Sequence, residues 1–267
     1  MLHNDKPKKR QIALNIQTTG VEPEVDDRII ELAALEYIDG VYTGNNFSTL
    51  INPEGKEISE EITRCNGITN EDVADAPIFA DIADKFFDFI KEDDVILQNA
   101  SFTIRFIDCE MYDREYKAGK MVAQLNAQIA EIENEPENIL KEKLPELSNL
   151  RMLCEHYNKI AKNIWLNFCV DRTIHDVMVL DQKLYPRREG NSHALNSICA
   201  RFKINIPIDH IAETRAKLAM QAYQHLCAED ERRTHALSQK KHTMFANKRS
   251  GIANAQDKEA PKQQKTM

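Results

Sequence analysis

The sequence lacks any long apolar run, and its apolar stretches fall far short of the roughly 20 residues that span a bilayer. The N-terminal stretch MLHNDKPKKRQIALNI starts basic but has neither the apolar core nor the small-residue cleavage site of a signal peptide. Apolar residues make up 42% and charged residues 29% of the chain, as in ordinary globular proteins. We therefore expect a cytoplasmic protein with one main core and no membrane-spanning segment.

A cysteine pattern typical of metal binding or disulfide bonding is also absent. No C-x-x-C pair occurs, and the six cysteines lie far apart along the chain. This spacing argues against a zinc site and against a secreted disulfide framework. The thiols expected to be free and buried are those of Cys65, Cys109, Cys154, Cys169, Cys199 and Cys227.

The formal net charge of −8 is unevenly spread along the chain. From Glu229 onward nine Lys and Arg residues stand against five Asp and Glu, so this tail carries about +4 and the preceding part about −12. No apolar period is sustained in the tail, which predicts a flexible basic end over 229–267. The charge alone does not decide whether the protein binds nucleic acid.

Hydrophobic periodicity predicts strands first and helices later. Residues 10–52 predict three strands, with Asp39-Gly40 as a tight hairpin turn between the second and third. A helical pattern follows from Thr69, which forms a capping box with Asp72. The stretch DVILQNA then predicts a short buried strand, and a further helix follows it.

The segment from about 115 to 167 differs in composition, being rich in Ala, Glu, Lys, Leu and Asn. It predicts two or three helices inserted into the main fold or packed beside it. Three more helical patterns fill the last third of the chain, and together these elements predict a mixed α/β sheet with helices on its faces. Active sites on such sheets lie at the carboxyl ends of the strands, where the first strand carries Asn15 and Gln17.

Several segments, in a fixed order, carry a resemblance to a known family. They are IALNIQTTG, RIIELAALEYIDGVYTGNNFSTLINP, CNGITNEDVADAPIFADIADKFFDFI, ILQNASFTIRFIDCE, HDVMVLDQKLYPRREGNSHALNSICARFKI and DHIAETRAKLAMQAY. Together they resemble the DnaQ-like 3′–5′ exonucleases, the family of the proofreading epsilon subunits of bacterial DNA polymerase III. The resemblance covers about 10–112 and 170–228. It implies a ribonuclease-H-like domain over 10–228, preceded by an N-terminal extension over 1–9.

This family removes terminal nucleotides with two divalent metal ions, which activate a water and stabilise the leaving 3′ oxygen. Mg²⁺ and Mn²⁺ prefer anionic oxygen ligands, and the family supplies four carboxylates together with a histidine as general base. The resemblance places the histidine at His210. It places the four carboxylate positions at Asn15, Gln17, Thr103 and Arg215. All four carboxylates are thus missing, so we expect no metal ion, and His210 to be a relic.

The resemblance also implies contacts with nucleic acid. We expect the cleft to hold single-stranded DNA or a 3′ end, with Arg215 on a phosphate; the alternative is that Arg215 only stabilises an empty groove. The residues expected to contact the strand are Thr18, Thr19, Gly20, Asn99, Phe102 and Arg215.

Three explanations for the missing carboxylates compete. A chain mutated to trap substrate suits Asn15 and Gln17, but Thr103 and Arg215 are poor isosteres of acids. Nearby acids provide a second explanation, in which an active exonuclease keeps Mg²⁺ or Mn²⁺; they are Glu22, Glu24, Asp108 and Glu213. The third, which we favour, is a family member that has lost catalysis and acts as a binding or scaffolding component of replication or repair.

Two features outside the resemblance leave partners open. The helices of 115–167 would serve as a protein-interaction module if they had gained an unrelated partner. In the tail, KKHTMF places Met244-Phe245 roughly where a clamp-binding peptide has its apolar pair, but the expected Gln is absent. A sliding clamp or a polymerase subunit is one interpretation of the tail, and an unpatterned end is the other.

Overall fold

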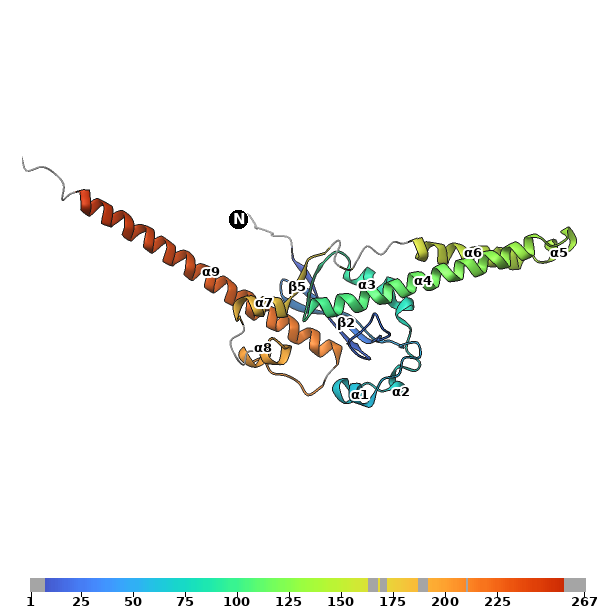
Figure 1. Ribbon diagram of the computed structural model, residues 1–267, viewed down its shortest axis with the longest axis horizontal. Helices are drawn as coiled ribbons and strands as arrows, with labels where there is room; N and C mark the ends of the chain where they lie inside the picture. The colour runs from blue at the N-terminus through green and yellow to red at the C-terminus, as the bar shows by residue number, and fades with distance from the viewer. Residues whose placement is uncertain (1–7, 163–167, 169–171, 187–191, 210, 257–267) are drawn as a thin grey trace, which may run out of the picture.

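The computed structural model has a central sheet with helices on both faces, and two helical extensions leave it in roughly opposite directions (Figure 1). It describes residues 8–162, 168, 172–186, 192–209 and 211–256, apart from the side chains of 162 and 240–256. Across these ranges, no helix combines the length and the apolar character needed to cross a membrane.

The three strands predicted for the start of the chain are confirmed as β1 (Arg10–Thr18), β2 (Ile29–Ile38) and β3 (Val41–Leu50). β1 pairs antiparallel with β2, and β2 with β3. Asp39 and Gly40 form the predicted turn, with φ of 50° and 79°. Positive φ at both positions is the geometry of the tightest hairpins, and Gly adopts it without steric cost.

Two parallel strands extend the sheet beyond β1. The predicted buried strand is β4 (Asp94–Leu97), and β5 (Ile174–Asp176) lies outside it, giving the order β3-β2-β1-β4-β5. One of the three helical patterns predicted for the last third of the chain, TIHDVMVLDQKLY, starts at Thr173, and the prediction was wrong for the three residues of β5. Asp176 ends the strand and caps helix α7 (Val177–Leu184), because its side chain accepts hydrogen bonds from the Met178 and Val179 N–H groups.

The helical pattern predicted from Thr69 is divided in the structure. Thr69 and Asp72 form the predicted capping box, but α2 (Asn70–Val73) is a single turn. Pro77 then disfavours a helical conformation in the residue before it, so α3 (Phe79–Ile90) starts as a separate helix. Before these elements, α1 occupies Glu60–Asn66.

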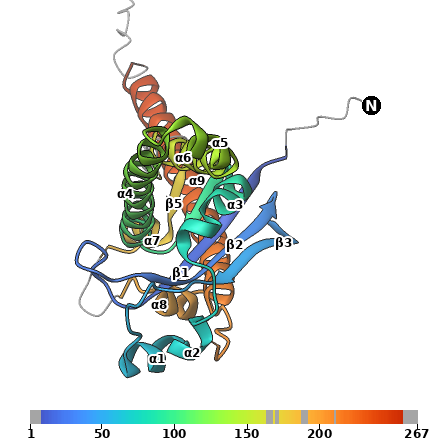
Figure 2. The ribbon, with the colours of Figure 1, turned by 90° about the vertical axis from the view of Figure 1, so that its right-hand side faces the viewer.

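Each face of the sheet is covered by its own set of helices (Figure 2). α3 and α4 (Ala100–Glu133) pack on one face, and α7, α8 (Leu195–Arg201) and α9 (Ala212–Gln256) pack on the other. This is the predicted mixed sheet flanked by helices. The two layers also decide where the side chains of β1 point.

Alternation along β1 places the polar positions on the α9 side. Ile12, Leu14 and Ile16 belong to the core shared with α3 and α4, whereas Ala13 belongs to the core shared with α9. Since side chains i and i+2 of a strand share a face, Asn15 and Gln17 point with Ala13 toward the α9 layer.

The inserted segment forms a helical arm. α4 runs straight out of the core, α5 occupies Glu137–Glu142, and α6 (Leu144–Lys162) packs back along α4. The Cys154 thiol of α6 donates a hydrogen bond to Asn126 Oδ1 of α4 at 3.3 Å. The helices expected over 115–167 are thus present through Lys162, and 163–167 lie outside the described residues.

The tail expected to be flexible from residue 229 is instead helical through Gln256, as the continuation of α9 (Figure 1). A helix that projects into solvent needs no apolar stripe, so the missing period did not exclude one. Residues 1–7 and 257–267 lie outside the described part of the chain.

The thiols are free but not uniformly buried. Cys154 and Cys199 are buried as expected, whereas Cys109 and Cys227 are half-buried. Cys65 is exposed, because it lies on the solvent side of the short helix α1, so burial was wrongly expected there. Cys169 lies outside the described residues.

Candidate functional site

The site begins with two amides at the carboxyl end of β1. Asn15 lies opposite Ala33 of β2, and Gln17 lies opposite Glu31. Asn15 Oδ1 is buried and accepts no hydrogen bond from the described part of the chain. An unsatisfied buried acceptor costs on the order of 1–3 kcal/mol, so Asn15 destabilises the fold at this position.

Thr103 stands in the first turn of α4, directly after β4. β4 lies parallel to β1 and beside it, so the start of α4 and the end of β1 share one edge of the sheet. Thr103 is only 2% exposed and offers a neutral hydroxyl. The position that the resemblance assigns to the third carboxylate therefore holds an uncharged and buried side chain.

Arg215 lies in the first turn of α9 and connects this helix to α8. Its Nη1 donates a hydrogen bond to Asn196 Oδ1 at 3.1 Å, and among the described residues it forms no ion pair. Burial raises the pKa of the nearby Cys199 thiol, and the Arg215 charge opposes that rise. His210, expected as the relic base, lies outside the described residues.

Glu31 was not among the expected site residues, although a lone acid inside the apolar run IIELAAL was a usable signal. It is 8% exposed and faces Gln17 across the strands. Its carboxylate accepts a hydrogen bond from the Ala212 N–H at 2.8 Å, which holds the start of α9 against β2. Burial raises the pKa of Glu31; the Ala212 N–H opposes that rise, and the charge of nearby Glu213 adds to it.

Comparison with known proteins identifies the domain that contains these residues. The exonuclease family model RNase_T matches residues 16–132. A DNA polymerase III subunit epsilon from Buchnera aphidicola subsp. Acyrthosiphon pisum is 32% identical over 203 residues, covering 74% of this chain and 63% of that protein. Another, from Rickettsia conorii, is 41% identical over 102 residues, covering 38% of this chain and 44% of that protein. The chain belongs to the DnaQ-like 3′–5′ exonuclease family.

Solved structures agree with this assignment at the level of the fold. A full-length 3′-exonuclease has a TM-score of 0.51 at 13% identity, covering 85% of this chain and 62% of that one. A 3′-exonuclease that recognises a histone mRNA stem-loop has a TM-score of 0.50 at 12% identity, with 84% of each chain covered. The ribonuclease-H-like fold is thereby confirmed. This DnaQ-like chain spans less than two thirds of the length of the first epsilon relatives.

The residues at the four positions that the resemblance assigns to metal ligands do not fit two divalent metal ions. Such a centre needs several anionic oxygen ligands close together. Here Asn15 and Gln17 are neutral amides, Thr103 is a buried alcohol, and Arg215 is a permanent cation. In the part of the chain that the structure describes, no group of three or more His, Cys, Asp and Glu side chains is placed to hold a metal ion.

Three of the four acids considered as replacement ligands have partners for their carboxylates, and for the fourth, Glu22, the contact described is one of its backbone. Glu24 forms an ion pair with Arg105, and Glu213 forms one with Lys217 at 2.6 Å. Asp108 Oδ1 accepts a hydrogen bond from the Phe168 N–H at 3.0 Å. Glu22 donates its backbone N–H to Asp27 Oδ2 at 3.0 Å, within the loop after β1.

The TTG residues after β1 build a tight loop around Asp27. Thr18 donates its hydroxyl to Gly20 O at 2.6 Å, and buried Thr19 donates to Asp27 Oδ1 at 3.1 Å. A Cβ on Gly20 would lie 2.2 Å from the Asp27 carboxylate, so a larger residue here would have to displace that carboxylate. Burial tends to raise the pKa of Asp27, but hydrogen bonds from Glu22 and Thr19 and the Lys56 charge lower it overall. Contact of these residues with nucleic acid stays a prediction.

The remaining predicted contacts lie where β4 passes into α4. Asn99 has φ of 62°, and its N–H donates to Asp176 Oδ1 at 3.2 Å. Phe102 packs on Phe106, with ring centroids 4.8 Å apart. Gln98 donates to the His193 carbonyl at 2.9 Å, while its own Oε1 is buried without a partner among the described residues.

A buried ionic cluster supports this edge of the sheet and was not expected. Asp181 is fully buried in α7, with Oδ2 at 2.7 Å from His193 Nδ1 and Oδ1 paired with Arg201 of α8. The available signal was that Asp181 shares a helical stripe with Val177 and Leu184, so its burial was foreseeable. The cluster ties α7 to α8 beside the Gln98 contact.

Proposed function

We propose that this DnaQ-like protein binds single-stranded DNA at a 3′ end without cutting it, as a non-catalytic component of a replication or repair assembly. One observation carries the proposal: all four metal-ligand positions hold residues other than Asp or Glu, within a frame that otherwise keeps the family's fold. Without a metal-bound water, a histidine at position 210 has no proton to remove.

The replacement residues also suit an anionic ligand. Four carboxylates facing one another repel unless metal ions neutralise them, and the substitutions remove that repulsion. Arg215 adds a permanent cation whose planar fork matches a phosphate. Among the described residues the Arg215 guanidinium donates one hydrogen bond, to Asn196. Its other N–H groups can therefore donate to a phosphate oxygen.

The names of the relatives support a place in a polymerase assembly. The Buchnera and Rickettsia proteins are named as DNA polymerase III epsilon subunits. For this chain we propose a polymerase subunit or a sliding clamp as partner of the segment after residue 229, where α9 leaves the core (Figure 1). No Mg²⁺ or Mn²⁺ is needed for this role.

Digestion of a 3′-labelled oligonucleotide tests the loss of catalysis. With Mg²⁺ or Mn²⁺ we expect no shortening of the strand, while the same oligonucleotide binds in EDTA. The Asn15→Ala variant is the matched control, since a contaminating nuclease would act equally in both preparations. Metal-dependent shortening by the wild type that disappears in Asn15→Ala would instead establish an active exonuclease with an unorthodox metal site.

The helical arm favours a second candidate, a protein-interaction role. On α6, Met152 is 65% and Leu153 43% exposed, on a segment outside the family resemblance. Isolated exposed apolar residues are common, but two adjacent ones on a projecting helix suit a partner contact. Replacing both with Lys should abolish capture of a specific partner while leaving oligonucleotide binding unchanged. Loss of oligonucleotide binding instead would rule out separate roles.

A further inference from the structure

Two exposed tyrosines stack on the outer side of α4, where the helix leaves the core. Tyr112 is 71% and Tyr116 53% exposed, and their rings lie 6.5 Å apart at 8° from parallel. The Lys120 ammonium lies 4.5 Å from the Tyr116 ring centroid. Spacing of four residues places these three side chains on successive turns of one stripe, so Tyr116 already receives a cation from the chain.

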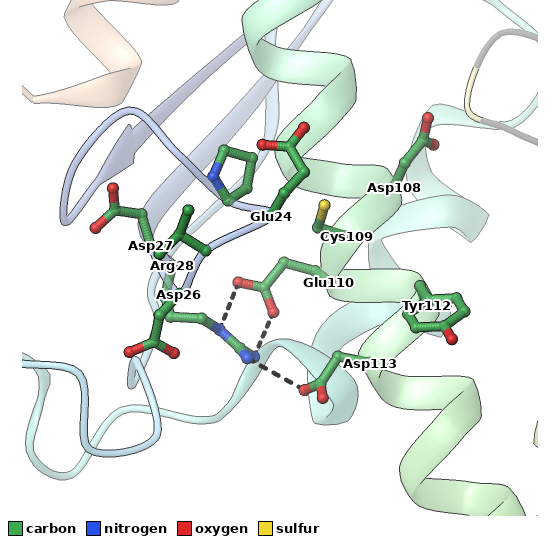
Figure 3. Close-up of a pocket in the computed structure, with 11 residues that line it drawn as sticks. Glu24, Asp26, Asp27, Arg28, Asp108, Cys109, Glu110, Tyr112 and Asp113 are labelled. Atoms are coloured by element: carbon green, nitrogen blue, oxygen red, sulfur yellow. Dashed lines mark hydrogen bonds and ion pairs between the residues drawn. The ribbon is translucent and has the colours of Figure 1, made fainter.

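Tyr112 also borders a cavity of about 380 Å³ between α4 and the loop after β1 (Figure 3). One guanidinium lines it, that of Arg28, which binds Glu110 and Asp113. Six carboxylates line it, those of Glu24, Asp26, Asp27, Asp108, Glu110 and Asp113. The lining is therefore strongly anionic.

Cations just outside the lining reduce this charge without cancelling it. Arg105 pairs with Glu24, Lys117 pairs with Asp113, and Lys56 lies 3.5 Å from Asp27. Together with Arg28 these make four cations, against the six lining carboxylates and that of Glu54, which pairs with both Arg28 and Lys117. A cationic group entering from outside is thus attracted to this face, whereas a phosphate is repelled.

The stripe itself has a place for that cation. Asp108 lies one turn before Tyr112 on the same stripe. The Tyr116 ring therefore has the Lys120 cation beside it, whereas the neighbour of Tyr112 on its far side is a carboxylate. A guanidinium laid on the Tyr112 ring would have the Asp108 carboxylate about one helical turn away, roughly 5.4 Å along the axis. Val25, 76% exposed in the facing loop, adds apolar surface beside the cavity.

We propose that the Tyr112 face of α4 is a docking site for an arginine-bearing basic segment of a protein partner. Arginine suits it better than lysine, because a planar guanidinium stacks on an aromatic ring and also bonds carboxylates with a fork of N–H groups. The site is distinct from the proposed strand-binding cleft, although both use α4: Tyr112 stands nine residues after Thr103, which is about 13.5 Å further along the helix axis. Arg215 lies on α9, at the other face of the sheet.

Fluorescence anisotropy on the full chain tests this site with defined probes. They are a labelled peptide of alternating arginine and alanine, the same peptide with citrulline in place of arginine, and a labelled oligo-dT strand. We expect the citrulline peptide to bind at least about tenfold more weakly, and Tyr112→Ala to weaken the arginine peptide by about fivefold. Tyr112→Phe should retain binding because the ring face remains. Val41→Ala, a similarly exposed residue on β3, should change nothing.

Equal affinity of the wild type for the arginine and citrulline peptides would overturn the proposal, whatever the variants do. Equal affinity of the wild type and Tyr112→Ala for the arginine peptide would do the same. Oligo-dT binding that requires Tyr112 would assign the face to nucleic acid instead. None of these results bears on Arg215, so failure here is distinguishable from failure of the proposed strand binding.

Discussion

Arg215 Nη1 donates a hydrogen bond to Asn196 Oδ1 at 3.1 Å, which joins α9 to α8 at the position where the resemblance implies a metal-binding carboxylate. If the rest of the guanidinium holds a phosphate, Arg215→Ala should weaken binding of a fluorescent single strand in EDTA by roughly three- to tenfold, as loss of one charge-assisted contact implies. The affinity of Arg215→Lys for the strand should lie between those of the wild type and Arg215→Ala, because lysine keeps the charge but lacks the planar guanidinium.

The matched control for this variant is Arg64→Ala, which removes an exposed arginine of α1 that is not among the residues assigned to the cleft. It should bind the strand as the wild type does. Unchanged affinity in Arg215→Ala would show that Arg215 only stabilises the groove.

Restoring the four carboxylates should restore a metal site. The combined variant Asn15→Asp, Gln17→Glu, Thr103→Asp and Arg215→Asp brings four anions together, so its melting temperature in EDTA should fall below that of the wild type. Mn²⁺ should recover the melting temperature, since a ligand that binds the folded state stabilises it. Thermal unfolding with and without Mn²⁺ measures this. Identical melting in both conditions would mean that the frame no longer positions metal ligands.

Burial of Glu31 makes stability depend on pH. Burial raises the pKa of Glu31 above its usual value of 4.5. The folded chain then holds this proton more tightly than the unfolded chain, so its contribution is complete below about pH 4 and is lost as pH rises through the raised pKa. Glu31→Gln keeps an oxygen for the Ala212 N–H and removes the charge. The melting temperature of Glu31→Gln should therefore rise relative to that of the wild type as pH increases. A difference in melting temperature that stays constant with pH would contradict this.

The buried Asp181 cluster should be needed for stability. Asp181→Ala leaves His193 and Arg201 without their shared carboxylate, and breaking a buried ionic contact by removing one partner costs about 3 kcal/mol. Urea unfolding followed by circular dichroism measures the change. Asp88→Ala, at an exposed position of α3, should stay within about 0.5 kcal/mol of the wild type. Equal midpoints for the two variants would show that the cluster is dispensable.

Local patterns were sufficient for the first three strands, but not for α1 or for the break between α2 and α3. The Asp39-Gly40 turn and the Thr69 capping box follow from residue chemistry over a few positions, and both are present. β5 was not predicted because three residues are too few to show a period. The helical course of α9 beyond 229 was not predicted because periodicity reports packing, and a solvent-exposed helix has no packed stripe to reveal.

The site was predictable only where the family resemblance supplied positions. Asn15 and Gln17 were placed correctly at the carboxyl end of the first strand, but the sequence did not predict that they face the α9 layer. The contacts of Glu31 with α9 and of His193 with Asp181 join segments far apart in the chain, and no local pattern encodes such pairings. The Tyr112 and Tyr116 stack follows a four-residue spacing, but its exposure depends on how α4 packs.

Calorimetric titration of the wild-type protein with Mn²⁺ tests the loss of the metal centre most directly. With amides at Asn15 and Gln17, an alcohol at Thr103 and a cation at Arg215, we predict no saturable heat of binding, while the carboxylate-restored variant binds under the same conditions. Robust saturable binding by the wild type that disappears in Asn15→Ala would contradict the account and make this chain a metal-dependent member of its family.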